Sequence, residues 1–123
     1  MTLSDAQLAL MRVLWERGET SVAEAAEALA VERRLAHTTV ATMLTRLEKR
    51  GLVEARRDGR QLHYRALVAE HDVRRSMVSG LLSMLFGGDA KALVAHLVRE
   101  DEIEPGDVER VRALLRAKGP RRG

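Results

Sequence analysis

The sequence predicts a mainly α-helical protein with one small β-hairpin, arranged as a winged helix-turn-helix followed by a C-terminal helical dimerisation segment. Three observations predict this fold. Apolar residues recur at helical spacing through most of the 123 residues. A short stretch after Gly51 instead alternates with a period of two and contains an Asp-Gly turn signal. The last roughly fifty residues carry apolar stripes but only one aromatic residue, which makes a poor independent core.

Composition limits the class of protein. Hydrophobic residues make up 46% of the chain and charged residues 32%, as in a folded globular protein. No apolar run approaches the roughly 18 residues of a membrane span. The first residues lack the basic and apolar regions of a secretory signal. With no cysteine, disulfides and thiolate metal sites are excluded. We therefore expect a cytoplasmic protein without membrane insertion.

Motifs of common enzyme classes are missing from the sequence. It has no Gly-rich phosphate loop, no nucleophile elbow and no His-Glu metalloprotease pattern. Its histidines, His37, His63, His71 and His96, are too scattered for a zinc motif and are interpreted as separate surface or hairpin residues. We expect no enzymatic activity, no metal and no cofactor.

Two capping boxes mark the first helices. Ser4 with Gln7, and Ser21 with Glu24, match the pattern in which two side chains satisfy the first backbone amides of a helix. The second helix is short and rich in alanine, and residues 30–35 form the turn that follows it. A short helix, a turn and another helix make helix-turn-helix order.

The stretch from residue 35 to Gly51 is predicted to be a helix with two unlike faces. The apolar stripe consists of Val40, Met43, Leu44 and Leu47. The opposite face consists of small hydroxyls and cations: His37, Thr38, Ala41, Thr42, Thr45, Arg46 and Lys49. Threonine is a mediocre helix former, so four threonines in one helix require another reason. Threonine hydroxyls can reach phosphates and base edges of DNA, which favours a recognition helix ended by a left-handed Gly51. The alternative is an ordinary amphipathic helix with a solvated polar face.

A hairpin follows this helix. Strand-like runs flank Arg57-Asp58-Gly59-Arg60, and Asp-Gly predicts a type I′ turn with positive φ at both central residues. Arginines 56, 57, 60 and 65 decorate the hairpin, and such a wing can lie along the phosphate backbone or enter the minor groove. The alternative is that these arginines only keep an exposed tip soluble.

Charge is unevenly distributed along the chain. Residues 1–32 hold two basic and six acidic side chains, whereas residues 33–65 hold nine basic and three acidic ones. The basic block coincides with the threonine-bearing helix and the hairpin. This coincidence is the pattern expected for phosphate binding.

The C-terminal half is predicted to contain three helices. One runs from about Asp72 to Phe86, with apolar spacings close to a coiled-coil seam; the next is capped by Asp89, and a third follows. Since these stripes need burial, we expect a homodimer. The residues expected to form its interface are Met77, Leu81, Leu82, Leu85, Leu93, Leu97, Val111 and Leu114. The alternative is that these helices fold back on their own winged domain.

These elements suggest a winged helix-turn-helix DNA-binding domain over residues 1–68, a helical dimerisation domain over 69–118 and a flexible tail over 119–123. The residues expected to bind DNA are His37, Thr38, Thr39, Thr42, Thr45, Arg46, Lys49, Arg57 and Arg60. A symmetric dimer would present two recognition helices to double-stranded operator DNA with a palindromic sequence. A winged-helix module that binds proteins and not DNA is the competing function.

Several segments resemble the BlaI/MecI family of penicillinase and methicillin-resistance repressors, which includes the CopY-type copper repressors. The matching segments are Trp15, residues 39–47 (TVATMLTRL), residues 49–53 (KRGLV), residues 63–67 (HYRAL) and Gly87-Gly88. The resemblance covers nearly the whole chain, from Leu8 to Lys118. It implies a dimeric repressor on an inverted-repeat operator. Thr39, Thr42 and Arg46 match relatives, whereas Ala41 replaces a basic residue found in some of them.

The resemblance also implies two ways of releasing the operator. In the best-known members a membrane sensor protease triggers cleavage at an Asn-Phe pair in the penultimate helix, and the matching positions here are His96 and Leu97. This candidate proteolytic site departs from the family pair. CopY-type members sense copper through C-terminal cysteines, which this chain lacks. A sensor protease system and a ligand- or metal-responsive regulator therefore both stay open.

Overall fold

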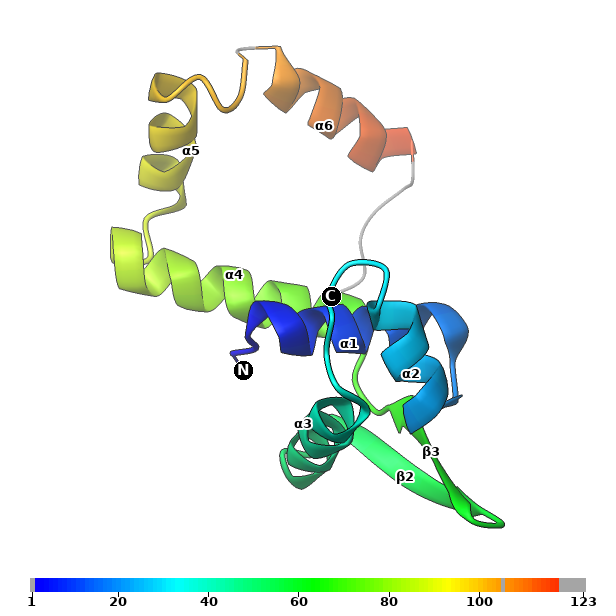
Figure 1. Cartoon of the computed structure of the whole chain (residues 1–123). Coiled ribbons are helices and arrows are strands. Elements are labelled where there is room, and N and C mark those ends of the chain that lie inside the picture. Colours follow the sequence, from blue (N-terminus) through cyan, green and yellow to red (C-terminus); the bar gives the residue numbers. More distant parts are fainter. Residues whose placement is uncertain (1, 105, 118–123) are drawn as a thin grey trace. The chain divides into compact units, whose positions relative to one another are not determined.

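The computed structural model describes residues 2–104 and 106–117, and the tail expected at 119–123 lies outside the described residues. The order of elements is α1 (Asp5–Arg17), β1 (Thr20–Ser21), α2 (Val22–Leu29), α3 (His37–Lys49), β2 (Val53–Asp58), β3 (Gln61–Ala66), α4 (Glu70–Phe86), α5 (Ala90–Arg99) and α6 (Asp107–Ala117) (Figure 1). The predicted fold class, mainly helical with a small hairpin wing, is confirmed. Contacts divide the chain into two compact units, residues 1–78 and 79–123.

Local capping sets the helix boundaries as predicted. Ser4 and Ser21 each accept a hydrogen bond from the backbone of the third helical residue, Gln7 and Glu24, whose side chains bond back. After α3, the Gly51 amide donates to the carbonyl of Glu48, and the Leu52 amide donates to the carbonyl of Leu47. This is a Schellman motif, and Gly51 at φ +77° supplies the left-handed residue that it needs.

The core of the first unit lies between α1, α2, α3, the sheet and the first turns of α4. Its largest fully buried side chains are Leu10, Met11, Leu14, Val40, Leu44, Leu47, Val53 and Val73. The Trp15 indole N–H donates to the carbonyl of Val68 at 2.9 Å, which ties α1 to the segment entering α4. Contacts group residues up to Val78 with this unit, because Val73 is buried in the core and Met77 packs against it.

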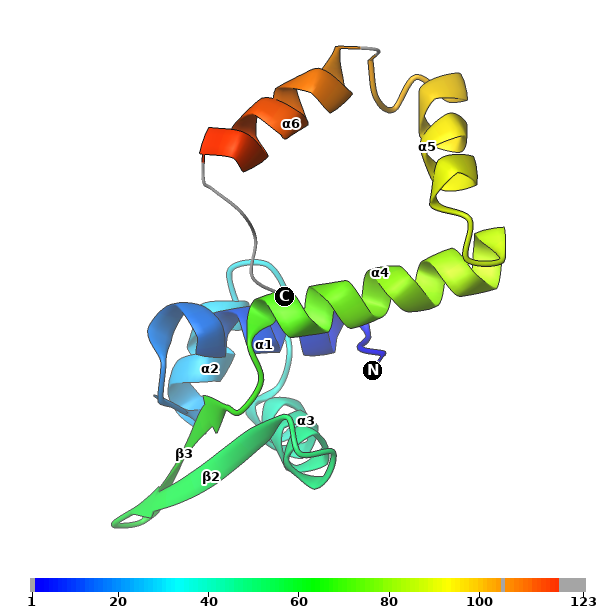
Figure 2. The same cartoon turned by 180° about the vertical axis from the view of Figure 1, so that it is seen from behind.

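The sheet is three-stranded and antiparallel, in the order β1-β3-β2. The strand β1 is not predicted by any sequence pattern; its Thr20 and Ser21 pair with Tyr64 and His63 of β3. Both views show the β2–β3 hairpin, here called the wing, extending away from the helices of the first unit (Figures 1 and 2).

The turn of the wing differs from the prediction. The last strand pair is Asp58 with Gln61, so the central residues are Gly59 and Arg60. Only Gly59 has positive φ, +63°, which fits a type II′ turn rather than type I′. The predicted register would have set Arg57 directly opposite Arg60, and like charges in that position are destabilising. In the observed register Arg57 is instead opposite Leu62.

The second unit consists of the end of α4, α5 and α6. Asp89 caps α5 as predicted, since its Oδ1 accepts from the amides of Lys91 and Ala92. Among the described residues, none after Val73 is buried. No single described helix is long and apolar enough to cross a membrane; α4 and α5 reach that length and composition only as a bent pair.

Candidate nucleic-acid interface

The two faces of α3 divide as predicted. Val40, Leu44 and Leu47 are fully buried, and Met43 is half-buried. The exposed side chains are His37, Thr38, Thr39, Thr42, Thr45, Arg46 and Lys49, together with the acidic Glu48. The helix is two residues shorter at each end than the predicted stretch, because Ala36 and Arg50 are its caps. All seven candidate DNA-binding residues of this helix are therefore open to solvent.

Two threonine hydroxyls on this face already donate to the helix itself. The Oγ1 of Thr42 donates to the Thr38 carbonyl at 2.9 Å, and the Oγ1 of Thr45 donates to the Ala41 carbonyl at 3.0 Å. The remaining lone pairs of these hydroxyls can only accept. In this rotamer they suit amino groups on base edges, whereas donating to a phosphate requires breaking the intrahelical bond.

The N-terminus of α3 is uncapped by any side chain. Its N-cap residue is Ala36, and the first turn contains no acidic residue. By contrast, α1, α2 and α5 have Ser4, Ser21 and Asp89 as side-chain caps. Amides at a helix start that lack an intramolecular partner are available to an anion, and the helix dipole favours negative charge there.

The wing has two faces with different electrostatics. Residues of the inner face alternate with those of the outer face along both strands. The inner face consists of Val53, Ala55, Arg57, Leu62, Tyr64 and Ala66, and the outer face consists of Glu54, Arg56, Asp58, Gln61, His63 and Arg65. Val53 and Tyr64 are buried in the core, which identifies the inner face as the one turned toward the helices.

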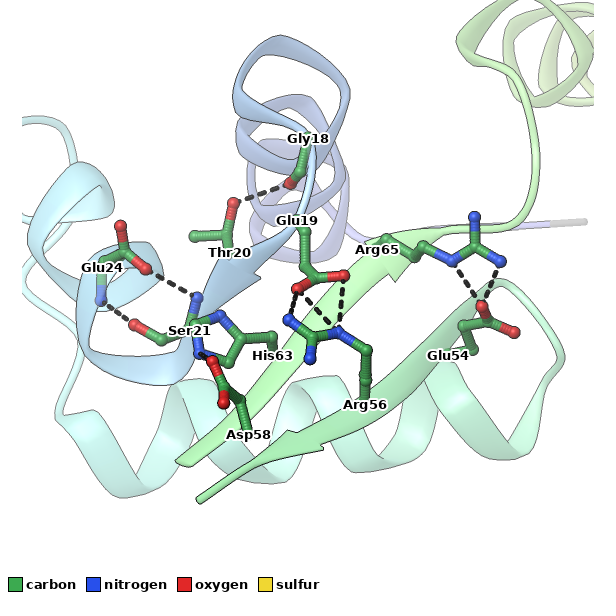
Figure 3. A network of polar contacts seen from close by, with 10 residues as sticks. All are labelled: Gly18, Glu19, Thr20, Ser21, Glu24, Glu54, Arg56, Asp58, His63 and Arg65. Atoms are coloured by element: carbon green, nitrogen blue, oxygen red, sulfur yellow. Dashed lines mark hydrogen bonds and ion pairs between the residues drawn. The ribbon is translucent and has the colours of Figure 1, made fainter. Parts of the chain in front are cut away.

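On the outer face, two arginines are paired with carboxylates (Figure 3). The Arg56 guanidinium donates from Nε to both carboxylate oxygens of Glu19, at 3.0 and 3.2 Å, and from Nη2 to Oε1. Arg65 similarly donates to Glu54. The hydrogen bond from Arg56, followed by Coulombic attraction, holds the pKa of Glu19 below its ordinary value. Both arginines are thus neutralised by the protein's own carboxylates.

The other two wing arginines are not paired in this way. Arg57, on the inner face toward the tip, and Arg60, in the turn, are exposed and make no ion pair with any described residue. Arg57 and Arg60 are the two wing arginines predicted from the sequence to contact DNA. Because successive side chains of a strand point to opposite faces, the sequence alone indicates that Arg56 and Arg57 lie on opposite faces of β2.

A hollow connects the wing tip with the start of α3. It has a volume of about 250 Å³ and is lined by Ser21, Val22, Ala23, His37, Arg60, Gln61 and Leu62. The structure therefore brings His37 of α3 and Arg60 of the wing to one surface of the first unit. No group of three or more His, Asp or Glu residues within the described ranges is arranged to hold a metal ion.

The expected dimerisation residues lie mostly outside any core in the single chain. Leu81, Leu85, Val111 and Leu114 are exposed, the last at 62%. Leu82, Leu93 and Leu97 are half-buried, and Met77 packs against the core of its own first unit. His96, at the candidate proteolytic site, is exposed within α5, and its ring lies 5.8 Å from that of Phe86.

Comparisons with known proteins agree with this architecture. The family model described as penicillinase repressor matches residues 3–117. The methicillin resistance regulatory protein MecI of Mammaliicoccus sciuri is 24% identical over 116 residues, which cover 94% of each chain. The penicillinase repressor of Bacillus licheniformis is 24% identical over 113 residues, covering 92% of this chain and 88% of the relative.

Solved structures match the first part of the chain. The solution structure of the DNA-binding domain of the repressor BlaI is 31% identical with a TM-score of 0.53, covering 58% of this chain and 87% of that one. Monomeric B. licheniformis BlaI in complex with the blaP half-operator is 30% identical with a TM-score of 0.51, covering 58% and 88%. The family resemblance is confirmed. The expectation of a non-enzyme is also confirmed, because members of this family are DNA-binding regulators without enzymatic activity. The chain belongs to the penicillinase repressor family, and it is a winged-helix DNA-binding repressor.

Proposed function

We propose that this repressor binds, as a homodimer, an inverted-repeat operator in double-stranded DNA, and that it acts in the cytoplasm. The observation that carries the proposal is the shared surface of α3 and the wing tip. His37 and Arg60 line one hollow there, while Arg46 and Lys49 are exposed farther along α3. Arg46, Lys49 and Arg60 make no ion pair with any other described residue, so DNA can approach them without displacing a carboxylate.

Each contact has a proposed role on this surface. The exposed side chains of α3 read base edges in the major groove, with Arg46 suited to guanine and the accepting hydroxyls of Thr42 and Thr45 suited to base amino groups. Arg57 and Arg60 bind backbone phosphates beside that groove, which positions the protein without selecting a sequence. The half-operator bound by monomeric BlaI supports one winged unit for each operator half.

Dimerisation is supported by the apolar surface of the second unit. Its exposed large side chains include Leu81, Met84, Leu85, Val111, Leu114 and Leu115, with Met84 at 75% exposure. A surface this apolar is typical of a protein interface. A second copy would bury the corresponding stripe on both chains and would set the spacing of the two recognition helices.

Release of the operator is proposed to depend on α5. Cleavage between His96 and Leu97 would divide this helix and remove α6 from the second unit. Family membership supports a membrane sensor protease system as the trigger. The test is the intact mass of the repressor recovered from its host before and after exposure to a β-lactam. A fragment ending at His96 supports cleavage, whereas derepression with an uncut chain favours a ligand-responsive regulator.

Selection of DNA fragments tests the main proposal. Purified protein is mixed with sheared genomic DNA at low and at physiological salt, and bound fragments are sequenced. One or a few inverted-repeat sites that survive physiological salt support the operator-binding dimer. Sequence-independent binding that disappears at physiological salt would refute it and favour an architectural role, whereas no DNA binding at all would favour the protein-interaction module.

A further inference from the structure

The wing contains more arginines than are available to bind DNA phosphates. Of its four arginines, Arg56 and Arg65 lie on the outer face, where Glu19 and Glu54 bind them (Figure 3). Glu54 and Arg65 are neighbours across one hairpin, directly opposite in the register of β2 and β3. Glu19 is different, because it lies outside the hairpin and 37 residues before Arg56 in the chain.

The sheet brings Glu19 to Arg56. Glu19 immediately precedes β1, whose Ser21 pairs with His63 of β3, and His63 pairs in turn with Arg56 of β2. The Glu19 carboxylate thus reaches an arginine on the strand beyond β3. The Glu19 side chain is one-third exposed and that of Arg56 is 56% exposed, so the pair lies at a surface that a polyanion can reach.

Pairing of this kind competes with phosphate binding. The guanidinium uses Nε and Nη2 on the two oxygens of Glu19, which is the same planar, bidentate contact that a phosphate would make. Glu19 is ionised at neutral pH, since its pKa lies below its ordinary value. A phosphate that binds Arg56 must therefore come close to the negatively charged Glu19 carboxylate and displace it.

We propose that Glu19 is a specificity-determining residue that keeps Arg56 away from DNA phosphates and so limits sequence-independent binding. The inference rests on the proposed function, in which the wing lies against DNA. With Glu19 in place, the wing contributes Arg57 and Arg60 to phosphate binding. Without it, Arg56 becomes an additional phosphate contact on any sequence, and the ratio of operator to non-operator affinity falls.

Salt dependence of non-operator binding measures this directly. Each phosphate contact contributes about −0.9 to the slope of log Kobs against log salt concentration. Glu19→Gln keeps the shape of the side chain and removes its charge, so the slope should steepen by about 0.9 for each winged unit on the DNA, or about 1.8 for the dimer. One such contact makes affinity fall by a further factor of about 3.5 between 50 and 200 mM salt. The measurement uses the full chain and a duplex without the operator.

Two variants separate this explanation from others. Glu19→Gln combined with Arg56→Gln should return the slope to the wild-type value. Glu27→Gln, an equal charge change at an exposed position of α2, should leave the slope unchanged.

An unchanged slope in Glu19→Gln, or an equal steepening in Glu27→Gln, would overturn the inference. Wild-type protein that fails to bind DNA in a salt-dependent way would instead refute the proposed function. Circular dichroism melts confirm that each variant is folded before its slope is interpreted.

Discussion

Arg46→Ala tests how α3 is oriented on DNA. Arg46 is exposed on the polar face and makes no ion pair with any described residue, whereas its neighbour Leu47 is fully buried. Truncating Arg46 should therefore change the free energy of unfolding by no more than about 0.5 kcal/mol. Any large effect should appear in DNA binding alone.

The size of that effect follows from one bidentate contact per subunit. Losing such a contact to a base costs about 1–3 kcal/mol, or roughly 5- to 150-fold in Kd. A dimer loses it twice at well-separated positions, so the cost on a full operator should be roughly 2–6 kcal/mol. On non-operator DNA the loss should be much smaller, because base readout does not contribute there.

The assay is fluorescence anisotropy with operator and scrambled duplexes at one salt concentration, alongside thermal melts. Leu47→Ala is the matched control on the opposite face of α3. It should lower the free energy of unfolding by about 2–5 kcal/mol and retain operator affinity in the molecules that stay folded. If Arg46→Ala destabilises the fold while operator affinity stays intact, Arg46 has been assigned to the wrong face.

Three other perturbations test the wing, the second unit and the outer-face ion pair. Arg57→Ala with Arg60→Ala should weaken binding to all duplexes alike and make the salt slope shallower by about 1.8 for each winged unit, or about 3.6 for the dimer; an unchanged slope would remove the wing from the contact surface. Leu81→Asp should give monomers in sedimentation, because a charge would enter an apolar interface, and a persistent dimer would show that the interface lies elsewhere. Acidification should cancel the stability that Glu19 contributes through Arg56. The lowered pKa of Glu19 means that the unfolded state takes up its proton first, so the contribution is complete above the ordinary value of 4.5 and is lost as pH falls through the lower value. Melts of wild type and Glu19→Gln between pH 7 and pH 3 should therefore converge at low pH, and a constant difference would contradict the pairing.

Features that depend on neighbouring residues were determined by the sequence alone. The capping boxes at Ser4 and Ser21 and the Asp89 cap of α5 involve partners within three residues. The glycine at position 51 ends α3 because its positive φ is a local requirement. The polar and buried faces of α3 follow from helical periodicity, which needs no knowledge of the partner surface. The candidate DNA-binding residues of α3 were identified for the same reason.

Features that join distant segments were decided only by the tertiary structure. The strand β1 is two residues long and exists because Thr20 and Ser21 meet β3. The Glu19–Arg56 ion pair depends on the pairing of β1 with β3, so no local sequence pattern predicts it. The turn type depends on the strand register, in which Arg57 lies opposite Leu62 and not opposite Arg60, and the Asp-Gly signal alone does not select that register. Short-range geometry is encoded in a few adjacent residues, whereas long-range pairing is selected by the packing of the whole unit.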